Sequence, residues 1–138
     1  MTHHSIDIRI YYEDTDAGGV VYHASYLKFG ERGRTEFLRS LGHENSQLTQ
    51  EEGILFVVKH IDIEYHKPAF LDDFLRQDTA IEAIKNSSFI MRQTAWRDDE
   101  KISEMRVALV TVDAKTIKPV RLPERIKLEF EKFIEVET

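Results

Sequence analysis

A short segment that follows the first apolar stretch of the chain gathers residue types that can attack a carbonyl carbon. It carries the carboxylates of Asp14 and Asp16, the glycines Gly18 and Gly19, and the imidazole of His23. A carboxylate can act as a nucleophile or a general base. Free N–H groups at a helix start can stabilise the negative charge that develops on the carbonyl oxygen. The segment therefore has the parts of a hydrolytic site.

Other interpretations of this segment make different demands on its residues. Aspartate and glycine are common in turns, so a turn without chemistry stays open on the residues alone. A calcium loop is excluded because Gly18 and Ser25 stand at its fifth and twelfth ligand positions, the second of which needs a bidentate glutamate. A zinc or iron site through Asp14, Asp16 and His23 lacks a second histidine at ligand spacing. Ser25 lacks the nucleophile elbow of a serine hydrolase. We therefore expect no metal.

Composition narrows the class of protein. The 138 residues are 41% apolar and 32% charged, and they suffice for one globular domain spanning residues 1–138. A net charge of −6 argues against nucleic acid or an anionic membrane as the main partner. The lack of cysteine excludes disulfides and a thiol nucleophile, and no apolar run is long enough to cross a bilayer. These features predict a cytoplasmic protein without a membrane span or signal peptide.

The period of the apolar residues locates one long helix after the carboxylate segment. Apolar and small residues recur at steps of three and four from Tyr26 to Leu41, and the helix is expected to end near Gly42. Gly30 and Gly33 fall on its apolar face, where each costs about 1 kcal/mol relative to alanine. We expect them to allow close approach of another backbone, as in a helix that lies tightly across a sheet.

Strands account for most of the remaining chain. A period of two predicts a half-buried strand over residues 6–12. Four more strands, the last three as an antiparallel meander, are expected over residues 56–66, 74–84, 89–97 and 102–113.

These elements predict the fold class. In the second strand the apolar side should consist of Val57, Ile61, Ile63 and Tyr65, and Pro123 should open a terminal helix. The whole is an α+β fold in which one long helix is wrapped by a strongly twisted antiparallel sheet of about five strands.

Residues 12–26, from Tyr-Glu-Asp-Thr-Asp-Ala-Gly-Gly to Ala-Ser-Tyr, resemble the signature of YbgC-type acyl-CoA thioesterases. This family is associated with the bacterial Tol-Pal envelope system and belongs to the 4-hydroxybenzoyl-CoA thioesterase class of the hotdog fold. The resemblance covers nearly the whole chain. It continues at residues 31–32, 34–36, 56–58, 64–65, 68, 71–73, 118–119 and 122–123.

The resemblance implies an acyl-CoA thioesterase that cleaves a thioester to a free acid and a thiol. Its catalytic carboxylate would be Asp16, as nucleophile or general base, and Tyr12 and His23 match the other residues implicated in activity. No cofactor is expected, since coenzyme A is part of the substrate. A thiolate leaves readily because thiol pKa values lie near 8.5, so one carboxylate with oxyanion donors can be enough. The backbone N–H of His23 is the expected donor.

Further residues are candidates for binding the substrate. Gly18 and Gly19 would let it approach the backbone closely, and Ser88 could donate hydrogen bonds from a turn. Val58 and Lys59 would form part of the site wall contributed by a second subunit, with Lys59 near the phosphates. The other basic candidates for the phosphates are Arg92, Lys115, Lys118, Arg121 and Arg125.

Partners and an alternative function follow from the same resemblance. The substrate would be an acyl-CoA or an acyl-carrier-protein thioester, and the protein is expected to form a homodimer or homotetramer. The alternative is a non-catalytic module that binds acyl thioesters or acts as a scaffold for envelope and phospholipid-synthesis enzymes. The carboxylate of Asp16 favours chemistry, since binding alone would not need it.

Overall fold

The computed structural model describes residues 3–134 of the chain. Within that range the elements follow the predicted order of one strand, one long helix, four strands and a terminal helix. Three short helical segments lie outside that prediction: η1 (Tyr12–Asp14), a 3₁₀ turn, α2 (Asn45–Gln47), and η2 (Leu48–Glu52), a π-helical turn. The helices and strands are β1 (His4–Arg9), α1 (Ser25–Ser40), α2 (Asn45–Gln47), β2 (Ile54–Tyr65), β3 (Phe74–Ile84), β4 (Ser88–Arg97), β5 (Glu100–Asp113) and α3 (Glu124–Glu131).

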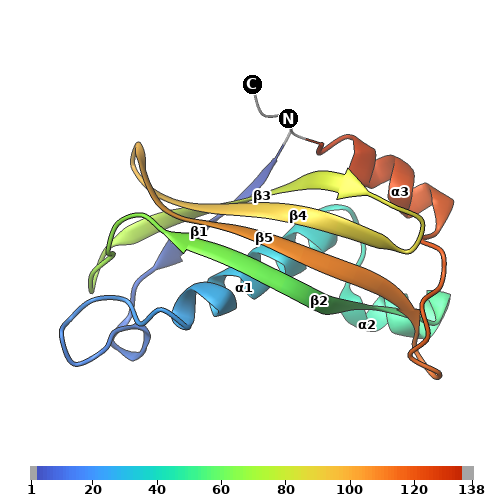
Figure 1. Ribbon diagram of the computed structural model, residues 1–138, viewed down its shortest axis with the longest axis horizontal. Helices are drawn as coiled ribbons and strands as arrows, with labels where there is room; N and C mark the ends of the chain where they lie inside the picture. Colours follow the sequence, from blue (N-terminus) through green and yellow to red (C-terminus); the bar gives the residue numbers. More distant parts are fainter. Residues whose placement is uncertain (1–2, 135–138) are drawn as a thin grey trace.

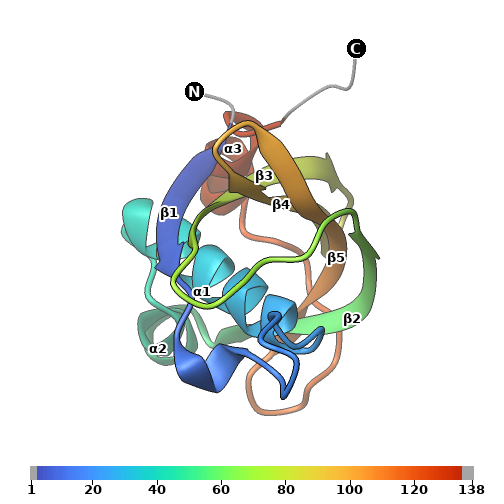
Figure 2. The same ribbon diagram turned by 90° about the vertical axis from the view of Figure 1, so that its left-hand side faces the viewer.

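The five strands of the described residues form one sheet with the order β1-β3-β4-β5-β2. Every neighbouring pair is antiparallel, and β3, β4 and β5 form the predicted meander. Figure 1 shows α1 lying along the sheet, and the end view in Figure 2 shows the sheet curling round the helix. A curved sheet can bury its apolar face on a single helix. The predicted α+β architecture is therefore confirmed.

Two glycines let α1 lie close to the sheet. A Cβ added at Gly30 would lie 2.9 Å from Met105 Cε, and one added at Gly33 would lie 2.9 Å from Thr79 Oγ1. The expectation that another backbone approaches these glycines was wrong, because side chains of the sheet fill the space. One of them, the fully buried Gln93, donates from Nε2 to the Gly30 carbonyl oxygen at 2.8 Å. The glycines thus allow a polar side chain of the sheet to hold the helix.

A β-bulge changes the side of β2 that faces α1. The pairing of β2 with β5 shifts register between Val58 and His60, so Lys59 is the extra residue. An extra residue reverses the alternation of a strand. Val58 therefore joins residues of α1 in lining a pocket, while Ile61 packs on the core beyond the bulge. The prediction that Val57 and Ile61 share one side was wrong for this reason.

The terminal helix α3 closes one end of the core. Pro123 precedes its first turn, as predicted, and Ile126 and Phe130 are fully buried. The ring centroid of Phe130 lies 5.0 Å from that of Phe89 and 5.7 Å from that of Phe37, in the range of favourable aromatic pairs. The helix therefore joins the sheet to the buried side of α1. None of the helices in residues 3–134 combines the length and apolarity needed to span a bilayer.

Candidate active site

Asp16 lies at the start of a tight, exposed loop between η1 and α1. Its backbone N–H donates to the Val20 carbonyl oxygen at 2.9 Å, and its Oδ1 accepts from the Gly18 N–H at 2.8 Å. Gly19 has a φ of +82°, a left-handed conformation that favours glycine. Within the described residues Oδ2 of Asp16 has no hydrogen-bond donor. The loop therefore fixes one carboxylate oxygen and presents the other to solvent.

Asp14, two residues earlier, has the opposite environment. It is buried, its Oδ2 accepts from the Tyr11 N–H at 2.8 Å, and its carbonyl oxygen accepts from the Tyr22 N–H at 2.8 Å. The same carbonyl oxygen accepts from the Ser25 hydroxyl at 3.2 Å. These bonds tie η1 to the start of α1. Asp14 and Ser25 are therefore structural residues, and of the two aspartates only Asp16 can meet a substrate.

The other two predicted catalytic residues also lie at this end of the molecule. Tyr12 was predicted at the end of a strand, but β1 ends at Arg9 and Tyr12 starts η1 with 82% of its surface exposed. His23 is exposed just before α1, and its ring centroid is 4.4 Å from that of Tyr22. No hydrogen bond joins His23 to Asp16 in the part of the chain that the structure describes.

The start of α1 offers the expected oxyanion donor. The helix begins at Ser25 with Ala24 as its N-cap, and no side chain caps it. Among the described residues nothing accepts a hydrogen bond from the His23 N–H. Unpaired N–H groups at a helix start carry positive partial charge. This N–H is therefore available to a carbonyl oxygen of a bound substrate.

A tyrosine that the sequence analysis placed on the apolar side of β2 supports this backbone. The Tyr65 hydroxyl donates to the His23 carbonyl oxygen at 2.9 Å, and its ring centroid lies 5.4 Å from that of Tyr26. Burial raises the pKa of Tyr65, so the hydroxyl stays protonated and remains a donor. Its contact spans 42 positions of the sequence, so no local pattern indicated it.

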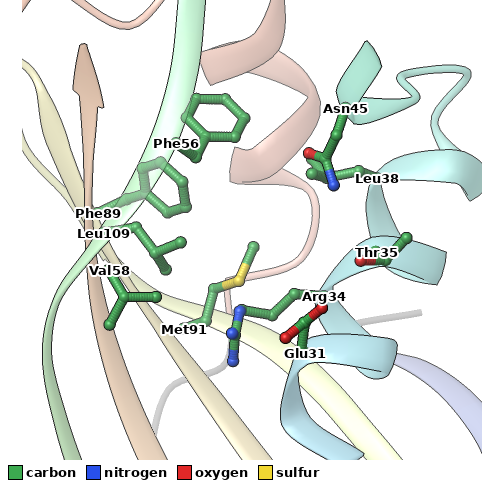
Figure 3. A pocket seen from close by; sticks show the side chains of 10 residues that line it. All are labelled: Glu31, Arg34, Thr35, Leu38, Asn45, Phe56, Val58, Phe89, Met91 and Leu109. Carbon is green, nitrogen blue, oxygen red and sulfur yellow. The ribbon is translucent and has the colours of Figure 1, made fainter. Parts of the chain in front are cut away.

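The residues predicted to bind substrate beyond the Asp16 loop are Val58, Lys59 and Ser88. Val58 lines a cavity of about 270 Å³ between α1 and β2, with Glu31 and Arg34 at one side, as Figure 3 shows. Lys59 is exposed at the bulge, and Ser88 is half-buried at the start of β4. Asp16 is not among the residues that line this cavity.

The basic candidates for the phosphates divide into two groups. Arg92 and Arg125 form ion pairs with Glu82 and Glu52, whereas Lys59, Lys115, Lys118 and Arg121 are exposed surface residues. Among residues 3–134, no group of three or more histidines, cysteines, aspartates or glutamates is placed to hold a metal ion.

Comparison with known proteins identifies the family. Residues 11–130 match the family model of the thioesterase-like superfamily. The chain is 43% identical over 126 residues to the acyl-CoA thioesterase YbgC of Haemophilus influenzae, and the matched region covers 91% of this chain and 93% of that protein. It is 44% identical over 124 residues to the acyl-CoA thioester hydrolase YbgC of Escherichia coli O6:H1, covering 89% and 92% of the two chains. The chain belongs to the YbgC family of acyl-CoA thioesterases.

Solved structures agree with this family membership. The crystal structure of a probable thioesterase from Bartonella henselae superposes with a TM-score of 0.84 at 39% identity, covering 88% of this chain and 99% of that one. The hotdog fold implied by the family resemblance is therefore confirmed, as is the prediction of an acyl-CoA thioester hydrolase at the level of the family.

Within this YbgC-family chain one further residue stands out that the sequence analysis did not assign. Arg34 of α1 lines the cavity beside Val58, and its Nη1 donates to Gln93 Oε1 at 3.0 Å. Burial lowers its pKa below the usual value for arginine. The sequence feature that could have indicated Arg34 is its position next to Gly33, at the border of the helix face that packs on the sheet.

Proposed function

We propose that this thioester hydrolase uses the Asp16 carboxylate to cleave an acyl-CoA or acyl-carrier-protein thioester. The observation that carries the proposal is the contrast between the two aspartates: Asp14 is buried and engaged, whereas Asp16 is exposed with one oxygen held by the Gly18 N–H. Oδ2 of Asp16 either attacks the carbonyl carbon or removes a proton from an attacking water.

Both routes end in the same products. In the first, a bond forms between Oδ2 and the carbonyl carbon, the C–S bond breaks, and water hydrolyses the resulting mixed anhydride. In the second, the hydroxide formed from water attacks directly. The thiolate leaves without needing a strong acid, because thiol pKa values lie near 8.5. The negative charge on the carbonyl oxygen is stabilised by the His23 N–H, a donor of a kind worth ~2.7–4 kcal/mol in the transition state.

The remaining site residues have supporting roles in this proposal. The His23 imidazole orients Asp16 or the attacking water, and Tyr12 borders the site from η1. Gly18 and Gly19 let the thioester lie close to the loop backbone.

We also propose that a second copy of the chain completes the site. The twelve-residue strand β2 is an edge of the sheet, and its unpaired backbone groups favour pairing with another strand. Pairing two β2 strands would bring Val58 and Lys59 of one copy toward the Asp16 loop of the other, which one copy alone does not do. A dimer, or a tetramer of two dimers, is the expected assembly.

Replacing Asp16 by asparagine tests the reaction. Asp16→Asn keeps an oxygen to accept from Gly18 but removes the charge, so thioester hydrolysis should fall by at least ~10²–10⁴-fold while the circular dichroism spectrum stays unchanged. Asp14→Asn is the matched control and should reduce turnover much less. A variant Asp16→Asn that keeps most of its turnover number would exclude the carboxylate mechanism.

A chelator separates this mechanism from metal-activated water. Activity should survive removal of divalent cations, because the proposed steps use a carboxylate and backbone donors. Activity that vanishes with the chelator and returns with zinc or iron would favour a metal-bound hydroxide instead.

The proposed function includes a location in the cell and protein partners. We expect a cytoplasmic enzyme whose partners include enzymes of lipid synthesis. Parallel thiol-release assays with acyl-CoAs and with the same acyl groups on a carrier protein would identify the natural thiol.

A further inference from the structure

The cavity between α1 and β2 combines an apolar wall with one arginine. Its apolar residues are Leu38, Phe56, Val58, Phe89, Met91 and Leu109, and Figure 3 shows Arg34 and Glu31 together at one end of it. Such a wall suits the hydrocarbon part of an acyl group. Glu31, Arg34, Thr35 and Asn45 form the polar side of the cavity, opposite the strands. The charge of Arg34 there needs an explanation, because desolvation of a charge is costly without a partner.

Arg34 differs from the other half-buried arginines of the chain. Three of the arginines in residues 3–134 are only partly exposed: Arg34, Arg92 and Arg97. Arg92 pairs with Glu82 at 3.2 Å and Arg97 pairs with Asp73 at 2.7 Å. No carboxylate of the described residues lies within 4 Å of the Arg34 guanidinium, whose one hydrogen bond goes to a neutral amide oxygen. Most of its five N–H groups thus remain available.

That amide oxygen is held rigidly. Gln93 is fully buried, and its Nε2 donates to the Gly30 carbonyl oxygen at 2.8 Å and to Thr79 Oγ1 at 2.9 Å. Its Oε1 accepts from Arg34 Nη1 at 3.0 Å. The guanidinium is therefore anchored from the sheet, in one orientation, at the edge of the cavity. A preorganised guanidinium loses little entropy when it binds a planar anion.

We propose that Arg34 is a specificity-determining residue that binds a carboxylate at the far end of the acyl group. The preferred substrates would be monothioesters of dicarboxylic acids, with the methylene chain against the apolar wall and the carboxylate paired with the guanidinium. Carboxylates and guanidinium groups match in geometry and form strong, charge-assisted hydrogen bonds. The inference rests on the proposed thioesterase function, with this cavity receiving the acyl group of a thioester held at the Asp16 loop of the second copy, and it adds a substrate class to that function.

The negative charge of Glu31 opposes the preference for acyl groups that end in a carboxylate. This residue is exposed, lines the same cavity and carries a negative charge that favours the charged form of Arg34. It would repel the carboxylate of the substrate, although solvent weakens this repulsion. Removing its charge should therefore strengthen binding of a carboxylate-bearing acyl group.

Rates on matched substrates test the proposal. We would measure kcat/KM for glutaryl-CoA against valeryl-CoA, and for adipoyl-CoA against hexanoyl-CoA, since each pair has the same number of carbons. The wild-type enzyme should prefer the dicarboxylic member. Arg34→Met should lower the rate on that member by ~10–100-fold and leave the alkyl member largely unchanged, the effect of one hydrogen-bonded charge pair. Glu31→Gln should raise the preference.

Controls separate this inference from the reaction itself. Arg32→Met removes an exposed arginine of the same helix outside this cavity and should leave the preference unchanged. Binding of glutaryl-CoA to the Asp16→Asn variant, measured by calorimetry, should also weaken when Arg34→Met is added.

Two outcomes would overturn the assignment. Equal rates on both members of a pair, or a preference that survives Arg34→Met, would refute the role of Arg34 and leave Asp16 in place. An enzyme that cleaves none of these thioesters would refute the proposed function, and this inference with it.

Discussion

At the scale of single residues, short-range hydrogen bonds decide which group can react. Asp14 and Asp16 are separated by one residue, yet the first ties η1 to α1 while the second faces solvent. The loop that connects Asp16 to α1 also brings the unpaired His23 N–H to the end of the molecule where Asp16 lies. Tyr65 then braces this backbone from β2 through the His23 carbonyl oxygen.

Removing the Tyr65 hydroxyl tests whether that brace matters for catalysis. Tyr65→Phe should lower kcat/KM by ~2–10-fold, the equivalent of one net hydrogen bond, because the His23 backbone would lose its anchor. The ring would still pack on Tyr26, so stability should change little. Tyr22→Phe is the control, since its hydroxyl has no hydrogen-bond partner among residues 3–134. Equal effects of the two substitutions would contradict a specific role for Tyr65.

At the scale of elements, tertiary contacts modify what the sequence pattern predicts. The alternation in β2 reverses at Lys59, and the buried ring of Phe130 on α3 completes the core beside Phe37 and Phe89. β3 has a second bulge between Ile81 and Ala83, where Glu82 accepts hydrogen bonds from arginines on the two following strands.

Truncating Phe130 tests the contribution of α3. Phe130→Ala removes a fully buried ring and should lower the free energy of unfolding by ~3–5 kcal/mol, the usual cost of such a cavity. Leu128→Ala on the exposed side of the same helix should change it by less than ~0.5 kcal/mol. Urea denaturation of both variants provides the comparison. A small effect at Phe130 would mean that α3 is not part of the cooperative core.

The Glu82 cluster predicts a dependence of stability on pH. Hydrogen bonds from Arg106, then those from Arg92, lower the pKa of the Glu82 carboxyl below its usual value. The folded state therefore binds this proton less readily than the unfolded chain does. Its stabilisation should be complete above the ordinary glutamate pKa of about 4.3 and should be lost as the pH falls toward the lower folded value. Thermal denaturation from pH 6 to pH 3 should show a flatter decline for Glu82→Gln, and equal slopes would contradict this role.

At the scale of the whole molecule, the open edge at β2 predicts the assembly. If the site needs Val58 and Lys59 from a second copy, dissociation should abolish activity. Analytical ultracentrifugation at assay concentrations should therefore find a dimer or a tetramer. A fully active species near the monomer mass of 16.2 kDa would refute the shared site.

The order of elements differs from the strand bulge and the long-range contacts in how far the sequence predicts it. The order of elements and the fold were predictable, because apolar periods of two and of three to four residues reflect local geometry. The reversal at Lys59 was not, since strand pairing rather than composition sets a bulge. Tyr65 and Arg34 were missed because their partners, His23 and Gln93, lie 42 and 59 positions away.

The strand order also has a consequence for how the chain folds as it is made. His4 of β1 pairs with Thr79 of β3, and Ile54 of β2 pairs with Asp113 of β5, so both edge strands are synthesised long before their partners. The meander of β3, β4 and β5 needs only local turns and can form first. Until it does, β1 and β2 are unpaired strands open to association with other chains. Productive folding of the nascent protein therefore depends on how soon the last strand leaves the ribosome.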